Sequence, residues 1–492
     1  MSGQELAEFY GYIAELAGSL GHADREVPFR GYTTGLLLPL ERKSVEPMAA
    51  RIDPARAMAA HQSLHHFVAK AEWSDAALLA AVCGSVLPAM QAHGPIAAWI
   101  VDDTGMPKKG RHSVGVARQY CGQLGKPENC QVAVSLSLAS ELASLPVNYR
   151  LYLPEAWAND AERRRKAGVP EKIDFQTKPA IALAQIEAAV AAGLPKGVVL
   201  ADAGYGADMK FQARLAELGL DFIVGVQPRA KIWTDGRQPL PPEPWSGKGR
   251  PPTNLRRDKE HPAVEAKAWA MTLPTETWHD VTWREGTKGQ LASRFTAARV
   301  RPAHLVGCGV PTAPHRDYWR NTPWPEVTVL AEWPEGEPEP TKIWFANMPA
   351  CTPLAELVRL AKLRWRIERD YLELKQELGL GHYEGRGWRG FHHHASLCIA
   401  AYGYLVQQRL ALSPSDPTNG PGGNTEPERP KAARLPKGYI PRGSPRKTRK
   451  ARPELHRHHA HPNRCPTGAH AATMSVLSAT AAARSSAILT IE

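Results

Sequence analysis

Little in the 492-residue chain indicates a secreted, membrane-spanning or zinc-stabilised protein. No two cysteines form a Cys-x2-Cys pair, which argues against a zinc ribbon or a disulfide framework and favours a reducing cytosol. No N-terminal segment joins a basic stretch to an apolar one, and no apolar run reaches the ~18–20 residues of a membrane span. These absences predict a soluble, cytoplasmic protein. The seven cysteines are Cys83, Cys121, Cys130, Cys308, Cys351, Cys398 and Cys465.

Acidic residues are scarce in one C-terminal segment. Between Arg429 and Arg464 there are twelve lysines and arginines against the single acid Glu454, so this segment supplies +11 of the net charge of +12. Residues 413–492 are also rich in proline and glycine, a composition that cannot bury a core. We therefore expect a disordered basic tail that binds phosphate non-specifically and in a salt-sensitive way.

The length and the hydrophobic periodicity predict several structural units, because the chain exceeds the usual size of one core. Residues 1–94 are predicted to be helical, residues 95–227 to alternate strands and helices, and residues 228–341 to form a β-rich insertion. Residues 342–412 are predicted to return to the α/β unit. The helices are expected over 5–20, 54–71, 75–93, 178–192, 207–218 and 391–410, with another starting at Pro353. The strands are expected over 96–101, 131–138, 147–153, 198–201, 221–226, 268–271, 277–283, 295–301, 326–333 and 342–348.

Three acids stand where metal ligands are useful. Asp102 and Asp202 each follow an apolar strand, and Glu368 lies in a stretch with helical periodicity. Two divalent cations about 3.5–4 Å apart can activate the attacking oxygen of a phosphodiester reaction and stabilise the leaving one. Carboxylates at strand ends are common in α/β folds, so each acid alone is weak evidence.

The helix around Glu368 carries a second pattern. Arg364, Glu368, Tyr371 and Lys375 are spaced four, three and four residues apart, so they project from one helix face. A carboxylate flanked by two cations suits a metal beside a phosphate. The alternative is a solvated face of ion pairs.

Taken together, these residues resemble insertion-sequence transposases of the DDE type. That family has an RNase-H-like mixed sheet carrying Asp, Asp and Glu, with the Glu in a Tyr-x2-Arg-x3-Glu-x6-Lys signature. Arg364, Glu368 and Lys375 match this signature, whereas Ala361 stands at the tyrosine position. The resemblance covers roughly residues 30–410, and a β-rich insertion before the glutamate is also a feature of the family.

The contexts of the two aspartates carry the resemblance further. Val101-Asp-Asp-Thr-Gly105 resembles the family's Asp-x-Thr, which makes Asp102 the ligand, with Asp103 as the alternative. Adjacent strand residues point to opposite faces, so only one of the two can face the site. Leu200-Ala-Asp-Ala-Gly-Tyr-Gly206 resembles the family's strand-Asp-x-Gly-Tyr turn. Residues 41–49 and 108–125 also look like one subgroup of these transposases.

The resemblance implies a prokaryotic transposase that cleaves the ends of an insertion element and joins the 3′-hydroxyl to target DNA. Asp102, Asp202 and Glu368 would hold two Mg²⁺ or Mn²⁺ ions. The N-terminal helices would bind the terminal inverted repeats, in a homodimer on paired ends. The residues expected to contact DNA are Arg364, Lys375, Tyr371, Lys108, Lys109 and Arg111. The alternatives are a nuclease that does not join strands and an inactivated transposase that only binds DNA.

Other features have less specific interpretations. The basic loop after Asp102 is predicted to hold phosphates of the scissile strand, and the alternative is an exposed hairpin turn. Trp245, Trp278 and Trp283 suit either strand handling or the core of a small β unit. We expect His392, His393 and His394 to be packing or phosphate-adjacent residues, since three consecutive residues cannot face one metal on a helix.

Overall fold

A computed structural model describes residues 3–412 of the chain, except residues 235, 254, 257, 258, 287, 288 and 304–322. The chain divides into two units, Met1–Pro430 and Lys431–Glu492, and every described residue belongs to the first. The basic tail predicted over residues 413–492 lies outside the described residues.

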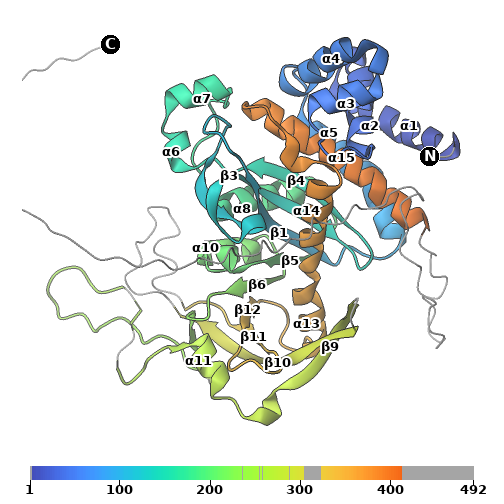
Figure 1. The fold of residues 1–492 in the computed structure, drawn as a ribbon. Coiled ribbons are helices and arrows are strands. Elements are labelled where there is room, and N and C mark those ends of the chain that lie inside the picture. Colours follow the sequence, from blue (N-terminus) through green and yellow to red (C-terminus); the bar gives the residue numbers. More distant parts are fainter. Residues whose placement is uncertain are drawn as a thin grey trace, which may run out of the picture. The chain divides into compact units, whose positions relative to one another are not determined.

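A mixed sheet forms the centre of this unit (Figure 1). β3 lies antiparallel between β1 and β4, and β5 and β6 follow β1 in parallel, as the order of predicted elements requires. β2 also pairs with β3 and was not predicted. This is the mixed α/β arrangement of an RNase-H-like domain. The strands are β1 (Ala98–Pro107), β2 (Ala117–Cys121), β3 (Lys126–Ala139), β4 (Ser144–Leu151), β5 (Val198–Ala201) and β6 (Phe222–Val226).

Alternate residues of β1 enter two different cores. Trp99 and Val101 belong to the apolar cluster that contains Ile181 of α8 (Lys178–Ala191). Ala98 and Ile100 belong to a second cluster, which is formed with α13 (Leu354–Leu363). Because side chains alternate along a strand, the next even-numbered residue faces the α13 side of the sheet and the next odd-numbered one faces α8.

Several shorter helices connect these strands. α6 and α7 follow β4, and α9 and α10 lie between β5 and β6. The predicted helix over 207–218 is confirmed as α10, although α9 precedes it as a separate turn. These helices are α6 (Glu155–Ala158), α7 (Ala161–Ala167), α9 (Ala203–Gly206) and α10 (Met209–Glu217).

The strands of the insertion continue the same sheet. β12 pairs antiparallel with β6, and β11 and β10 follow it outward. The strand predicted over residues 268–271 is wrong, because Ala266–Met271 forms helix α11, in which Ala266 and Ala270 are buried one turn apart. The insertion's strands are β7 (Lys231–Trp233), β8 (Val264–Glu265), β9 (His279–Gly286), β10 (Gly289–Pro302) and β11 (Val327–Trp333), and β12 (Lys342–Ala346) follows the insertion and joins it to β6.

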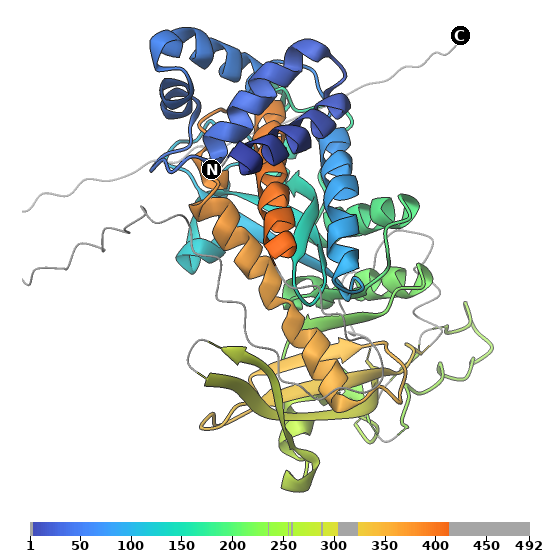
Figure 2. The same ribbon diagram turned by 90° about the vertical axis from the view of Figure 1, so that its right-hand side faces the viewer.

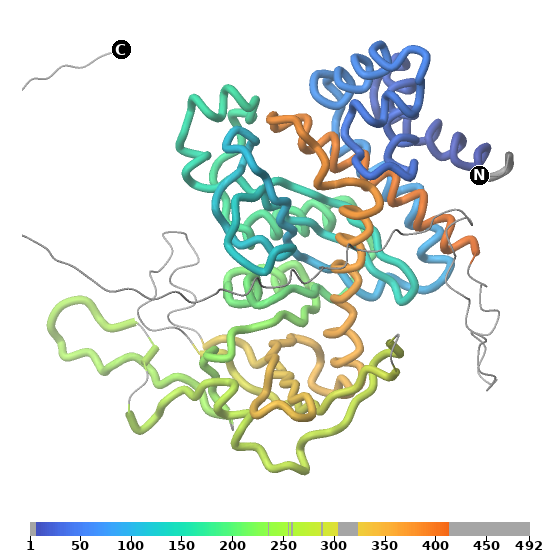
Figure 3. Tube along the Cα trace, viewed as in Figure 1, coloured from blue at the N-terminus to red at the C-terminus, as the bar shows by residue number. Residues whose placement is uncertain are grey.

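The N-terminal helices lie beside the long helix α15 (Trp388–Leu412) in Figures 1 and 3, and their buried residues belong to the same apolar core as those of α15. The hydroxyl of Tyr12 donates to the carbonyl of Ala400 (2.8 Å), and Gly403 lets α15 approach α5 closely. Among the described helices, α5 alone is long and apolar enough to cross a membrane, but it packs against α15. The N-terminal helices are α1 (Gly3–Ala17), α2 (Glu26–Leu37), α3 (Val45–Ile52), α4 (Ala57–Ala69) and α5 (Asp75–Ala92).

The helix predicted to start at Pro353 is divided in two. α13 ends at Leu363 and α14 covers Trp365–Gln376, while Arg364 between them keeps helical dihedral angles. The pair runs from the strands of the insertion to the N-terminal helices (Figure 2). One face of the α13–α14 pair therefore passes the end of strand β5.

The consecutive histidines of α15 are packing residues. The Nε2–H of His394 donates to the carbonyl of Gly379 (3.0 Å), and its Nδ1 accepts from the hydroxyl of Tyr32 (2.9 Å). His392 likewise donates to the carbonyl of Trp388 and accepts from the amide of Leu151. The neutral rings of His392 and His394 thus have both nitrogens satisfied without a metal or a phosphate. The two ring nitrogens of His393 lie within hydrogen-bond distance of the carbonyls of Val68 and Trp73, so this ring is also held by the protein.

Acid should destabilise this core through His394. Burial lowers the pKa of His394 to about 4 from an ordinary value of 6.5, so the folded state binds its proton less readily than the unfolded state. The stabilisation is complete above pH 6.5 and is lost as the pH falls to about 4, by about 3 kcal/mol. Urea unfolding at several pH values should show this loss for wild type and a flatter curve for His394→Gln. The exposed His66 of α4 provides the control, His66→Gln, and parallel curves for all three proteins would contradict the assignment.

Candidate active site

Asp102 lies on the α13 side of the sheet. Its Oδ2 accepts a hydrogen bond from Nη2 of Arg364 (3.1 Å), and its Oδ1 accepts from the amide of Asp103 (2.8 Å). Burial raises the pKa of Asp102 to about 7, although the Arg364 guanidinium acts in the opposite direction. β1 continues to Pro107, so Asp102 is not at the end of its own strand as predicted. It does lie beyond Ala98–Ile100, the part of β1 that pairs with β5.

Asp103 faces the other side of the sheet. Its carboxylate forms an ion pair with the Lys178 ammonium at the start of α8. The alternation along β1 therefore separates the two neighbouring acids, and Asp102 is the one that faces the other candidate ligands.

Asp202 follows β5 directly and caps the short helix α9. Its Oδ1 accepts from the amide of Gly204 (2.8 Å), which fixes one carboxylate oxygen. A Cβ at Gly206 would lie 1.9 Å from the carbonyl oxygen of Gly225, so this turn requires glycine. The other oxygen, Oδ2, lies 3.9 Å from Nη2 of Arg364, and the side chain is 47% exposed.

Glu368 approaches from the helix. Its Oε1 lies 3.2 Å from Nη1 of Arg364, one turn earlier, and its side chain is 69% exposed. Arg364 thus contacts carboxylates from three separate elements, β1, the β5–α9 turn and α14. The acids predicted from sequence do meet, and a guanidinium lies among them.

This arrangement bears on whether the site can hold a metal. Within the part of the chain that the structure describes, no three His, Cys, Asp or Glu side chains are close enough together to hold a metal ion. The guanidinium of Arg364 contacts a carboxylate oxygen of each of the three acids, so a positive charge already lies among them. Three convergent carboxylates are hard oxygen ligands of the kind that Mg²⁺ and Mn²⁺ prefer. The donor set fits a divalent metal once the arginine moves aside.

The rest of the signature faces the sheet as the helical spacing predicts. Nζ of Lys375 donates to the carbonyl of Gly105 (2.9 Å), and the hydroxyl of Tyr371 lies 2.7 Å from that of Ser135. Tyr371 is 7% exposed, so the predicted DNA contact of Tyr371 is wrong for this structure. Burial also lowers the pKa of Lys375. Both residues join α14 to the central strands.

The basic loop after β1 holds one half-buried and two exposed cations. Nζ of Lys108 donates to the carbonyl of Tyr383 (2.7 Å), and burial lowers its pKa to about 8, so this ammonium is bound by the protein and its DNA contact stays a prediction. The side chains of Lys109 and Arg111 are exposed. These two remain candidates for phosphate contacts.

Sequence reasoning missed a contact between the insertion and the helix of Glu368. The guanidinium carbon of Arg284, on β9, lies 3.8 Å from the ring centroid of Trp365, the residue that follows Arg364. Trp278 and Trp283 pack edge-to-face on other rings of the insertion, as the core interpretation predicts, whereas Trp245 is exposed. The sequence contained one signal for this contact, because Trp365 directly follows the signature arginine Arg364.

Tyr371 should contribute to stability and not to DNA affinity. Tyr371→Phe removes the hydroxyl that pairs with Ser135 and leaves that buried hydroxyl unsatisfied, which should cost about 1–2 kcal/mol of unfolding free energy. Denaturant unfolding would measure the loss, and fluorescence anisotropy on duplex DNA should show an unchanged Kd. A large loss of DNA affinity in a stably folded variant would contradict the structural role.

Arg364 should stabilise the metal-free protein. Arg364→Ala leaves the buried carboxylate of Asp102 without its cation, which should cost about 3 kcal/mol of unfolding free energy in EDTA. The control is Arg359→Ala, because Arg359 pairs with Glu356 and Glu141 on the surface, where such pairs contribute below about 1 kcal/mol.

The same variant should bind Mn²⁺ more tightly than wild type in isothermal titration calorimetry. The guanidinium and the metal ion compete for the same carboxylates, so removing one favours the other. Equal costs for Arg364→Ala and Arg359→Ala, or weaker Mn²⁺ binding by Arg364→Ala, would contradict this account.

Comparison with known proteins agrees with this geometry. The chain is 29% identical over 264 residues to the probable transposase for insertion sequence element IS701 of Microchaete diplosiphon, over 52% of this chain. The aligned part spans 65% of that relative's length. The sequence model of the DDE superfamily endonucleases matches residues 15–290, a range that contains Asp102 and Asp202 but ends before Glu368. With a match over more than half of its length, the chain belongs to the DDE superfamily endonuclease family.

Proposed function

We propose that this protein is a DNA transposase that cuts the ends of an insertion element and joins the freed 3′-hydroxyl to target DNA. The observation that carries the proposal is the convergence of Asp102, Asp202 and Glu368 on one guanidinium. Three acids supplied by two strands and a helix are not needed to hold the sheet together. Three carboxylates that lie close together repel one another, which destabilises the folded chain. A cation that binds between them during the reaction would explain why the fold brings them together.

The three acids would hold two Mg²⁺ or Mn²⁺ ions, which supply an activated nucleophile and stabilise the leaving oxygen. Asp102 is the least exposed ligand and is fixed by the amide of Asp103. Asp202 is oriented by the amide of Gly204, and Glu368 is free to adjust because its side chain is the most exposed of the three. Two fixed ligands and one adjustable ligand suit a site that processes two successive substrates.

The cations around the site would neutralise phosphate charge. Arg364 is already among the ligands, so after release from them its guanidinium would bind a phosphate of the reacting strand in bidentate fashion. Lys375 positions β1 through the carbonyl of Gly105 and lies one turn beyond Tyr371. Lys109 and Arg111 would contact the strand beyond the site.

The proposed partners are the terminal inverted repeats of the element and a target duplex. Joining two ends to one target requires two active sites, so a homodimer on paired ends is the proposed assembly. The N-terminal helices would recognise the repeats.

Loss of any of the three acids should abolish strand cleavage. A labelled duplex carrying the ends of the element that encodes this chain should be cut and joined to a plasmid in Mg²⁺ but not in EDTA. Asp102→Asn, Asp202→Asn and Glu368→Gln should each lower the cleavage rate by at least about 100-fold, since even the residues that only orient metal ligands contribute 10- to 100-fold.

The matched control is Asp103→Asn, which changes the neighbouring carboxylate on the opposite face of β1. We expect it to retain cleavage within about tenfold of wild type, with some loss of stability from the Lys178 ion pair. Cleavage without joining would identify a nuclease in place of a transposase. Equal activity of Asp102→Asn and Asp103→Asn would remove Asp102 from the site.

A further inference from the structure

A hollow on the described surface lies away from the three acids. It has a volume of about 690 Å³ and is enclosed by α3, α4, α7 and the glycine-rich loop Tyr383–Gly390. Five lysines and arginines line it against two acids, Glu46 and Glu384. The cations are Lys70, Arg165, Lys166, Arg386 and Arg389. We name this hollow the basic groove.

The acids offset only part of the positive charge of the groove, because among the described residues Glu46 alone faces the three unpaired cations. Glu384 is already paired with Arg42, whose Nε lies 2.8 Å from its carboxylate. Lys166 and Arg389 are paired with Glu162 and Glu72, which do not line the groove. Lys70, Arg165 and Arg386 have no ion pair among the described residues, and all three are exposed. The groove therefore presents uncompensated positive charge.

The floor and wall of the groove are rigid. The ring of Tyr383 is buried, and a Cβ at Gly385 or Gly390 would collide with its hydroxyl, at 2.1 and 1.7 Å. Glycine is required there because the loop wraps around this ring. The loop is also joined to the segment after β1, since the amide of Val114 donates to the carbonyl of Arg386 (3.0 Å). The cations are thus held on fixed backbone.

The groove connects to the three acids along β1. The strand runs from Asp102 to Pro107, which corresponds to about 17 Å or about five base pairs of B-form DNA. The next residue, Lys108, is bound to the carbonyl of Tyr383 at the start of the glycine-rich loop. The exposed Lys109 and Arg111 follow Lys108 in the chain, and Nη2 of Arg163 on α7 donates to the carbonyl of Arg111 (3.4 Å). The segment after β1 therefore joins the strand of Asp102 to two walls of the groove, the glycine-rich loop and α7.

We propose that the basic groove binds the sugar-phosphate backbone of duplex DNA several base pairs from the bond that is cut. The phosphates would be contacted by Arg165, Arg386 and Lys70, which lie on three separate elements. Such contacts position a duplex without reading its bases, so we expect no sequence recognition in the groove. The proposal rests on the proposed function, since it assumes that the substrate of the three acids is DNA. It adds a second binding surface that is shared by the N-terminal helices and the catalytic unit.

The salt dependence of binding tests the groove. The probe is a fluorescein-labelled 30-base-pair duplex of arbitrary sequence, measured by anisotropy with the full chain in EDTA at several salt concentrations. Arg165→Ala/Arg386→Ala should weaken Kd by at least about tenfold and reduce the slope of log Kd against log salt by about 2. The basic tail is present in every protein and cancels in the comparison.

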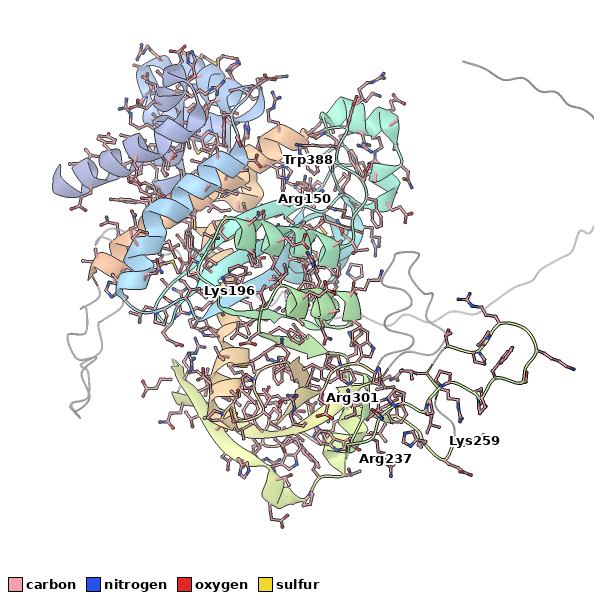
Figure 4. All side chains as sticks on the ribbon, turned by 180° about the vertical axis from the view of Figure 1, so that it is seen from behind. Arg150, Lys196, Arg237, Lys259, Arg301 and Trp388 are labelled. Atoms are coloured by element: carbon pink, nitrogen blue, oxygen red, sulfur yellow. The ribbon has the colours of Figure 1, made fainter. Side chains whose placement is uncertain are left out.

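The matched control is Arg237→Ala/Lys259→Ala, which removes the same charge from exposed loops of the insertion. In Figure 4 both residues lie far from the labelled Trp388, which lies within the glycine-rich loop, at the start of α15. We expect the control to keep the wild-type slope and both variants to keep the wild-type melting temperature, because these side chains are exposed.

Three results would overturn the inference. The first is that Arg165→Ala/Arg386→Ala keeps the wild-type slope of log Kd against log salt. The second is that the control variant loses as much of that slope as the groove variant does. Either result would show that the groove makes no phosphate contacts of its own. The proposed function would survive either result. A wild-type chain that binds no duplex at any salt concentration would overturn the proposed function together with the groove.

Discussion

Repulsion among three carboxylates is the constraint on which this molecule depends. Asp102, Asp202 and Glu368 come from elements far apart in sequence, and without a cation between them they would separate. Arg364 supplies that cation from the same helix as Glu368. Its placement depends on α13 and α14, since Arg364 lies between the two helices. In the proposed function, this ion pair network holds the acids in place and must rearrange when a metal ion binds.

The sequence predicted the central sheet well because its strands have short-range signals. Alternation and apolar runs identify β4, β5 and β6 to within three residues, whereas the predicted strands end six residues short of the end of β1 and begin five residues after the start of β3. The same reasoning failed at Ala266–Met271, where a short alternating pattern is compatible with both a strand and one turn and a half of helix. Sequence pattern also did not indicate that β12 would pair with β6, since strand pairing depends on long-range contacts that local periodicity does not contain.

Sequence predicted which acids lie near one another, but it predicted less well which cations are exposed. Sequence shows that Asp102 and Asp103 face opposite sides of the sheet, because side chains alternate along a strand. Which acid faces α13 came only from the structure, since every residue from Ile96 to Val101 is apolar and either face could be the one with the site. The burial of Lys108 and Tyr371 cannot be deduced from sequence, since it depends on the carbonyl of Tyr383 and the hydroxyl of Ser135, which are far away in the chain. A long polar side chain gives no local sign of whether it reaches outward or folds back onto a distant carbonyl.

The common core of the N-terminal helices and α15 has a consequence for biosynthesis. Tyr12 bonds to Ala400, a separation of 388 residues, so the first helices to leave the ribosome lack their partner until nearly all of the described chain has been translated. Apolar residues such as Phe9 and Ile13, fully enclosed in the finished fold, must stay exposed during that interval. Each nascent chain therefore exposes these apolar residues for most of its synthesis, a condition that favours aggregation and makes the order of folding depend on the last described helix.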